Sequence, residues 1–595
     1  MVLVPIAILT FIQRPLGLAK THKALGRTVD ILLILISIIT AVYVVLNHDR
    51  LLGVGMFFPT QLDQIVFALQ LGIVVELCRR TCGNALPLVG LGLVLYAVLG
   101  QYLPGLWGHN GYSLERILGT LVSEEGIFGL PMRVMVRYIF LFIMFSVFLE
   151  FSGVGPFIIR AANALAGKYR GGPAKVSVVA SAAFGTISGS TVANVISTGS
   201  FTIPMMKKLG YPPHFAAGVE AVASTGGQFM PPVMVGTAFI VMEFAGVSYA
   251  TLMLAAALPA VLYYITLLLQ IDTEAIKQRL KGLAPEDVPL LKEVLKRGAY
   301  LLLPLIILVF DLLVLGRSIL HAGLVSIMSC IVISWFKKDT RIGIKRLFLG
   351  FYNSTRESQS VYAACAVAGI IIGVLAMTGL GIKLGGLLAE LSGGRGWVLI
   401  VMTGILGLIL GMGMTTTADY IILATVMAPA LILAGYPPLS VHLMALYYAV
   451  LNAFTPPVAL GSFAAAGIAQ CSPMKTSAVA CRLGIMIYFL PVLFMYNPEL
   501  LLQGSPAAIL TTTSFVVIAV IATAMSLSGV TYFGVFLKLW ERALFIVGAI
   551  GMATPFGVLR FAGLALCVLV FLGNRQTREI LLRPFNRGAA RSEAG

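Results

Sequence analysis

Hydroxyl and glycine residues interrupt two long apolar runs of this chain. The first interruption is Gly185–Thr191 (GTISGST), and the second is Gly411–Thr417 (GMGMTTT). A helix that ends inside an apolar environment leaves carbonyl groups at its C-terminus and N–H groups at the next N-terminus without partners. Such ends bind hard cations through oxygen atoms or anions through N–H groups, and hydroxyls serve either role. Each segment is therefore interpreted as the tip of a re-entrant hairpin with a binding function, against the alternative of small residues that pack two helices closely.

A double proline follows each hairpin, in Ser224–Pro232 (STGGQFMPP) and in Asn452–Pro457 (NAFTPP). Proline lacks the backbone N–H and clashes with the preceding turn, so each pair should unwind a helix and free carbonyl groups. The alternative is two kinks of structural value only. The tips and the unwound helices are expected to meet in one cavity. The candidate substrate- or ion-binding residues are Ser188, Gly189, Ser190, Thr191, Asn194, Gly226, Gly227, Gln228, Pro231, Pro232, Gly411, Gly413, Thr415, Thr416, Thr417, Asp419, Asn452, Thr455, Pro456 and Pro457.

Two carboxylates lie inside these apolar segments, where a charge is costly and usually functional. Asp419 follows Thr415 by one helical turn, so we expect it to cap the hairpin or to hold a cation. Glu220 lies on the first unwound helix and is the candidate coupling acid. Na⁺ is the candidate metal at the tips, and the coupling ion is Na⁺ or H⁺. No catalytic residue and no other cofactor is expected. For the remaining ionisable residues of apolar stretches, an interface position or a salt bridge is favoured: Glu76, Glu150, Glu243, Asp311, His214 and His442.

The composition excludes several classes of protein. Of the 595 residues, 59% are hydrophobic and 11% are charged, against roughly 25% charged in a soluble domain. No soluble fold hides so much apolar surface, which leaves a multi-span membrane protein. The net charge of +17 comes from basic residues in short stretches between apolar runs, as in cytoplasmic loops, and does not indicate nucleic-acid binding. The sequence has no GxxxxGK[ST] or HExxH motif, and we predict that it is not an enzyme.

Apolar windows predict an all-α polytopic protein. The clear spans lie near Ile31–Leu46, Ile65–Leu77, Ala85–Leu103, Val134–Phe151, Tyr249–Ile271, Tyr300–Leu315, Ile319–Phe336, Val361–Met377, Val479–Tyr496, Ala508–Met525 and Ala553–Leu572. The basic segments Asp272–Arg297 and Asn574–Gly595 are expected in the cytoplasm. Ser113–Gly129 is predicted to be an interfacial connector.

The two interrupted regions repeat at an offset of 225 residues. At this offset 13 positions between Thr191 and Gly236 are identical, including both double prolines, which lie 19 residues apart in each copy. Glycine and proline dictate backbone shape, so the copies should share a fold. Lys207 and Lys208 precede the first GYPP, whereas Ala434 and its uncharged neighbours precede the second. This asymmetry favours opposite orientations in the membrane, which is typical of secondary transporters with a midplane site.

Four motifs resemble those of the membrane component of tripartite ATP-independent periplasmic (TRAP) transporters. They are Phe184–Pro213, Ser224–Met234, Ile409–Ile421 and Ala453–Ala469. The chain is most similar to fused permeases that work with TAXI-type binding proteins. This resemblance implies a small-subunit-like scaffold with a connector at residues 1–126. It implies a transport core at 127–496, with inverted repeats at about 174–240 and 397–465. Extra helices and a basic tail at 497–595 lie beyond the usual core.

The resemblance also implies a function. A periplasmic TAXI-type binding protein would deliver a small carboxylate or amino acid to a permease in the inner membrane of a bacterium or archaeon. An ion gradient would drive uptake by an elevator movement. Asn194 stands where the better-characterised TRAP branch has Asp, which keeps proton coupling open. The alternative is a stand-alone ion-coupled carboxylate or anion transporter. An ion channel is disfavoured because it would not need paired hairpins.

Overall fold

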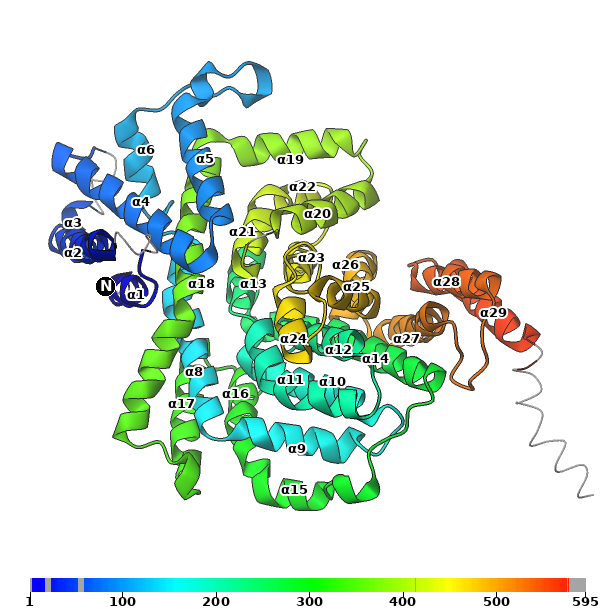
Figure 1. Ribbon diagram of the computed structural model, residues 1–595. Helices are drawn as coiled ribbons and strands as arrows, with labels where there is room; N and C mark the ends of the chain where they lie inside the picture. The colour runs from blue at the N-terminus through cyan, green and yellow to red at the C-terminus, as the bar shows by residue number, and fades with distance from the viewer. Residues whose placement is uncertain (1–2, 17–22, 52–57, 413, 575, 577–595) are drawn as a thin grey trace, which may run out of the picture. The chain divides into compact units, whose positions relative to one another are not determined.

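The computed structural model describes residues 3–16, 23–51, 58–412, 414–574 and 576, and these residues form helices almost throughout (Figure 1). Among them, β pairing is limited to one isolated bridge between Val530 and Phe536. Eight helical segments are long and apolar enough to cross a membrane, by length and composition. They are Leu25–Leu46, Gln61–Cys82, Ala85–Tyr102, Leu130–Phe151, Tyr249–Lys277, Ile344–Thr378, Pro473–Tyr496 and Pro506–Ser528. The predicted all-helical, multi-span architecture is confirmed at this level.

The chain divides into two compact units. Unit 1 comprises Met1–Val154, Gly236–Ala250 and Tyr300–Asn452, and unit 2 comprises Gly155–Val235, Thr251–Ala299 and Ala453–Gly595. The helices of unit 1 are α1 (Leu3–Gln13), α2 (Lys23–Leu46), α3 (His48–Arg50), α4 (Gln61–Cys82), α5 (Ala85–Leu99), α6 (Leu114–Leu121), α7 (Leu130–Val134), α8 (Phe140–Phe151), α13 (Thr237–Ala245), α16 (Leu303–Leu313), α17 (Ile319–Ser334), α18 (Ile344–Thr378), α19 (Leu380–Leu391), α20 (Gly396–Leu410), α21 (Thr416–Val426), α22 (Ala428–Leu433) and α23 (Pro438–Val450).

Unit 2 contains most of α9 and of α14, whose first residues belong to unit 1. Its helices are α9 (Val154–Ala166), α10 (Gly172–Ser188), α11 (Thr191–Lys208), α12 (Pro213–Gly226), α14 (Tyr249–Lys277), α15 (Leu291–Gly298), α24 (Leu460–Ala469), α25 (Pro473–Leu483), α26 (Met486–Tyr496), α27 (Pro506–Ser528), α28 (Leu539–Ala553) and α29 (Gly557–Gly573).

Helix α18 is the longest described helix of unit 1. It has 35 residues and packs against α4, α5, α8 and α21. The connector that follows α6 approaches it closely, because α18 has glycine where they meet. A Cβ atom at Gly373 would lie 3.1 Å from the Glu125 carbonyl oxygen, and one at Gly369 would overlap the Gly126 carbonyl. The segment Ser113–Gly129, expected to be an interfacial connector, contains the short helix α6, and the glycines of α18 allow the part that follows α6 to pack closely onto α18.

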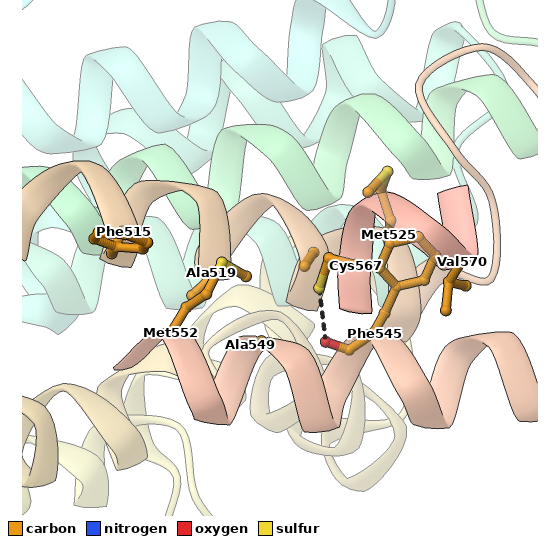
Figure 2. Packing of buried hydrophobic residues seen from close by; sticks show 9 residues of the cluster. Phe515, Ala519, Met525, Phe545, Ala549, Met552, Cys567 and Val570 are labelled. Atoms are coloured by element: carbon orange, nitrogen blue, oxygen red, sulfur yellow. Dashed lines mark hydrogen bonds between the residues drawn. The ribbon is translucent and has the colours of Figure 1, made fainter. Parts of the chain in front are cut away.

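Helices α27, α28 and α29 form a hydrophobic core of their own within unit 2 (Figure 2). Phe515, Met525 and Phe545 lie in this core with Cys567, whose thiol donates to the Phe545 carbonyl oxygen at 3.8 Å. The predicted span at Ala553–Leu572 begins instead at Gly557, and α28 precedes it. This helix was not predicted because its first turn carries two charges. Both charges are satisfied locally: Glu541 accepts from the Lys538 N–H at 2.7 Å, and Arg542 donates to the Ser526 carbonyl at 2.6 Å.

Candidate ion and substrate sites

The two interrupted regions repeat in backbone geometry at the offset of 225 residues. Ser190 and Thr415 are N-caps, and their side chains accept from the N–H groups of Ala193 and Ala418. Further along, four features recur at the same offset. These are a glycine with positive φ (Gly210 at 94°, Gly435 at 92°), a helix start (Pro213, Pro438), a cis double proline (Pro231-Pro232, Pro456-Pro457) and a non-glycine residue with positive φ (Met234 at 63°, Ala459 at 40°). The predicted repeat is therefore present in the fold.

The first hairpin consists of α10 and α11, and only Gly189 and Ser190 separate the two helices. The break is shorter than the seven-residue tip expected from Gly185–Thr191, since Gly185 to Ser188 are still helical. Gly189 has φ of 58°, and a Cβ atom there would lie 2.5 Å from the Met234 carbonyl oxygen. Ser188 is half-buried and Ser190 is exposed. A tight glycine turn and a serine cap thus close the tip.

Asn194 links the two arms of this hairpin. Its amide donates to the Ser181 carbonyl oxygen at 2.9 Å, and the Thr198 hydroxyl contacts its side-chain oxygen at 3.2 Å. Asn194 is 1% exposed, so these bonds satisfy a polar group that burial would otherwise penalise. In this structure its side chain therefore bonds to the protein and holds α10 and α11 together.

The unwound segment that follows α12 packs against the tip of the first hairpin. The Gln228 amide donates to the Thr191 hydroxyl at 2.7 Å, and both residues are buried. Gly185 of α10 and Gly227 face each other so closely that a Cβ atom on either would overlap the Cα atom of the other. The structure thus brings the candidate residues Thr191, Gly227 and Gln228 close together. Gly226 packs under the Tyr263 and Tyr264 rings, whereas Pro231 and Pro232 lie half-buried in the turn that follows.

This glycine contact gives a direct prediction. Gly227→Ala should destabilise the fold and abolish transport, because the new methyl group meets the Gly185 backbone, which cannot move without displacing α10. We expect a loss of about 1–3 kcal/mol, seen as a lower thermal midpoint of the detergent-purified protein. Gly386→Ala is the matched control, since a Cβ atom there meets nothing within 4 Å. Equal midpoints for the two variants would contradict the close contact.

Glu220 lies at the centre of a buried cage of hydroxyl groups, the Glu220 cage. Its carboxylate is 0% exposed and accepts hydrogen bonds from hydroxyls on three helices of unit 2. The donors are Ser177 (2.7 Å), Ser181 (2.9 Å), Ser224 (3.1 Å), Thr198 and Thr202. None of these five donors is among the candidate residues predicted from the sequence, although Ser177 and Ser181, and likewise Thr198 and Thr202, are spaced i, i+4 and so share a helix face. Two such pairs of hydroxyl residues on the helices before Glu220 are the sequence pattern from which the cage could have been predicted.

The second hairpin has a longer break. Helix α20 ends at Leu410 and α21 begins at Thr416. The N-cap is Thr415, so the expectation that Asp419 caps the hairpin is wrong. Asp419 is the fourth residue of α21, whereas a capping residue directly precedes its helix. Thr416 is half-buried, and the buried Thr417 hydroxyl contacts the Thr237 hydroxyl at 2.9 Å. Gly413 lies outside the described residues.

Asp419 is the most unusual polar group of unit 1. It is 0% exposed, and neither carboxylate oxygen has a hydrogen-bond partner among the described residues. Its Oδ2 atom lies against the end of α20, 2.5 Å from where a Gly411 Cβ atom would stand, and Asn452 borders the same spot. The Asn452 amide donates to the Met414 carbonyl at 3.3 Å. A buried carboxylate without a partner must be protonated or must face a cation. The Gly407 carbonyl oxygen also borders the Gly411 position, and carboxylate and carbonyl oxygens are the ligands that hard cations prefer.

The candidate residues divide between the two units. Unit 2 holds Ser188 to Asn194, Gly226 to Pro232 and Thr455 to Pro457, and unit 1 holds Gly411 to Asp419 and Asn452. Thr455 contacts the Tyr488 hydroxyl at 2.8 Å, whereas Pro456 and Pro457 are partly exposed. Each unit therefore contains one hairpin tip and one of the two candidate carboxylates, Glu220 in unit 2 and Asp419 in unit 1.

Other ionisable residues have structural partners. Glu76 forms salt bridges with Arg79 and Arg80, both at 2.7 Å, and Asp311 pairs with His321 at 3.2 Å. His442 contacts the Tyr420 hydroxyl at 3.0 Å. Among the residues described, no His, Cys, Asp and Glu side chains cluster in a way that could hold a metal ion. For Glu76, expected at an interface or in a salt bridge, the structure shows the salt bridge, and for Asp311 it shows a contact with a histidine.

Comparison with known proteins identifies the family. Residues 69–509 match the model for the DctM component of tripartite ATP-independent periplasmic transporters. The C4-dicarboxylate TRAP transporter large permease protein DctM of Vibrio cholerae is 27% identical over 441 residues, which cover 69% of this chain and 93% of that protein. The isethionate TRAP transporter permease protein DctMQ of Oleidesulfovibrio alaskensis is 24% identical over 461 residues, 71% of this chain and 70% of that protein.

A third relative is the 2,3-diketo-L-gulonate TRAP transporter large permease protein YiaN of Escherichia coli. It is 24% identical over 402 residues, which cover 66% of this chain and 90% of that protein. The family match begins inside the segment assigned to the scaffold and ends before α28 and α29. Since the match spans well over half of the chain, the protein belongs to the DctM family of TRAP transporter permeases and is a multi-pass membrane protein.

Proposed function

We propose that this permease imports a small organic anion that a periplasmic TAXI-type binding protein delivers, and that an ion gradient drives the import. The observation that carries the proposal is the buried Asp419, which has no hydrogen-bond partner in the described chain and follows a capped helix start at a break in the fold. A carboxylate in this state gains a partner when an ion binds, so ion binding and the local structure become coupled.

The helix starts at the two breaks support an anionic substrate. The first N–H groups of α11 and α21 lie beside Ser190 and Thr415, and a helix N-terminus attracts negative charge. The relatives named for C4-dicarboxylates, isethionate and 2,3-diketo-L-gulonate support the same class of small anion. We infer that the two hairpins are re-entrant, that the repeats are inverted in the membrane, and that the hairpins move together as an elevator.

Two carboxylates offer different forms of coupling. Asp419, with oxygen atoms nearby, suits Na⁺ or a proton, whereas the Glu220 carboxylate is already surrounded by hydroxyl donors and suits a proton alone. Na⁺ would require those hydroxyls to turn their lone pairs toward the ion, which would break their bonds to Glu220. Coupling to Na⁺ would therefore assign Asp419, whereas coupling to protons leaves both carboxylates as candidates.

Uptake by proteoliposomes tests the proposal. The purified permease with a TAXI-type binding protein and its ligand should accumulate the ligand under an inward Na⁺ or proton gradient, and each gradient should be imposed alone. Without the binding protein we expect at least a tenfold lower rate, because the permease must then capture the ligand unaided. Equal uptake without the binding protein would favour a stand-alone transporter instead.

A further inference from the structure

We propose that a polar pocket in unit 1 binds the phosphodiester headgroup of an anionic membrane lipid, phosphatidylglycerol. The pocket has a volume of about 650 Å³ and lies between the end of α1 and the first half of α18, which are neighbours in the fold (Figure 1). Its lining includes Gln13 at the end of α1, Arg14 directly after it, and Tyr352, Arg356, Glu357 and Gln359 from α18. None of these residues belongs to the hairpins or to the two buried carboxylate sites.

The pocket lies where α18 changes from a polar to an apolar helix. With 35 residues α18 is about 52 Å long, well beyond the roughly 30 Å that a hydrocarbon core requires. Its apolar second half, from Val361 to Thr378, spans about 27 Å at 1.5 Å per residue. The pocket residues of α18 immediately precede this half. They are therefore at the depth of the lipid headgroups.

The first half of α18 has the composition of an interfacial helix. Lys345 and Arg346 are followed by exposed apolar side chains, among which Phe348 is 69% exposed and Phe351 is 45% exposed. Exposed aromatic groups next to basic residues are typical of a helix that lies at the membrane surface. The excess of basic residues also indicates the cytoplasmic leaflet, which is where anionic lipids attract such segments.

Arg14 is held in place by neutral groups, so its charge is available to a ligand. Its guanidinium donates to the carbonyl oxygens of Arg80 at 2.8 Å and Thr81 at 3.1 Å. The carboxylates nearby are already engaged, since Asp30 and Glu76 both pair with Arg80, at 2.6 and 2.7 Å. Carbonyl contacts orient the side chain without neutralising it, and this is the arrangement that a phosphate site requires.

Arg356 supplies the second charge. Among the described residues its guanidinium has no hydrogen-bond or ion-pair partner, although it lines a pocket whose other groups are ordered: Gln13 donates to the Tyr352 hydroxyl at 2.7 Å, and Gln359 donates to Gln13 at 3.3 Å. Two guanidinium groups match the phosphodiester. The Glu357 carboxylate in the same pocket disfavours a bare, doubly charged phosphate and accepts hydrogen bonds from the hydroxyls of a glycerol headgroup.

Lipid binding to the purified full-length protein tests this inference. Delipidated protein should retain phosphatidylglycerol in native mass spectrometry and should gain thermal stability from it. Phosphatidylethanolamine and inorganic phosphate, added separately, should have smaller effects. Arg356→Gln should weaken phosphatidylglycerol binding about tenfold, since a charge-assisted contact contributes roughly 1.4 kcal/mol or more. Arg395→Gln is the matched control, because Arg395 is an exposed arginine of the same unit that does not line the pocket, and it should bind as the wild type does.

Each remaining outcome overturns the proposal. Equal binding of phosphatidylglycerol and phosphatidylethanolamine would remove the anionic headgroup as the ligand. Stabilisation by inorganic phosphate as strong as that by lipid would identify a site for a soluble anion. Unchanged binding by Arg356→Gln and by Arg14→Gln would place the lipid elsewhere. Because Arg356 makes no hydrogen bond or ion pair with the described residues, its variant should fold even where the Arg14 variant does not.

Discussion

Asp419→Asn should reduce gradient-driven uptake about 100-fold or more and should leave the protein as stable as before, or more stable. The substitution nearly preserves shape and removes only the charge and the ionisable proton. A buried carboxylate without a partner opposes folding, so its neutral replacement should not lower the thermal midpoint. An ion that has lost its charged ligand loses about 3 kcal/mol of binding, which corresponds to roughly 100-fold in affinity.

Uptake and the thermal midpoint, measured on the same variant, together separate a functional role from a structural one. A fall in uptake at an unchanged thermal midpoint assigns Asp419 to ion coupling, whereas a fall in both would make it a packing residue. Glu390→Gln is the matched control, because Glu390 is an exposed carboxylate in the same unit. If Asp419→Asn retains the wild-type dependence on Na⁺ and on pH, the site has to be sought at the Glu220 cage.

Asn194 explains why asparagine should fit at position 419. The two positions correspond in the repeat, since 194 + 225 = 419, and each lies in the first turn and a half of the helix that follows a capped break. Asn194 is fully bonded to its own hairpin, whereas Asp419 is not. The backbone of the second hairpin should therefore accept the amide, which could make the bond to the neighbouring arm that Asn194 makes.

The recurring glycine turns and proline helix starts of the repeat could be predicted from the sequence, because the residues involved act locally. Gly210 and Gly435 adopt positive φ, and Pro213 and Pro438 each begin a helix, in both copies of the repeat. Glycine and proline restrict backbone geometry whatever surrounds them. Long-range packing has little influence on such positions, so their spacing was sufficient to place them.

The groups around each carboxylate could not be predicted in the same way. The Glu220 cage depends on three helices meeting, and a serine or threonine within an apolar helix is compatible with many partners, including its own carbonyl at i−4. The length of each break also depends on packing. Gly185 remains helical because it meets Gly227, whereas α20 ends at Leu410, with Asp419 and Asn452 against the next residue.

Glu220→Leu should destabilise the protein by about 3 kcal/mol or more, enough to prevent recovery of folded protein from the membrane. Five buried hydroxyls lose their acceptor, and each unsatisfied group costs roughly 1–3 kcal/mol. Thr198 and Thr202 have an alternative, because their hydroxyls also bond to carbonyl oxygens one turn earlier, at 2.8 and 3.1 Å. The loss therefore comes mainly from the three serines, and a protein domain has only about 5–15 kcal/mol of stability in total.

Glu220→Gln separates this structural role from proton coupling. The amide oxygen still accepts from the cage, and its N–H groups can donate to hydroxyl oxygens, so we expect a folded protein with a midpoint within a few degrees of the wild type. The amide cannot release a proton. If Glu220 carries the coupling proton, uptake driven by a pH gradient is lost in this variant, while exchange of substrate across the membrane without a gradient persists. If pH-driven accumulation survives in Glu220→Gln and fails in Asp419→Asn, the Glu220 cage is a structural element and Asp419 is the coupling carboxylate.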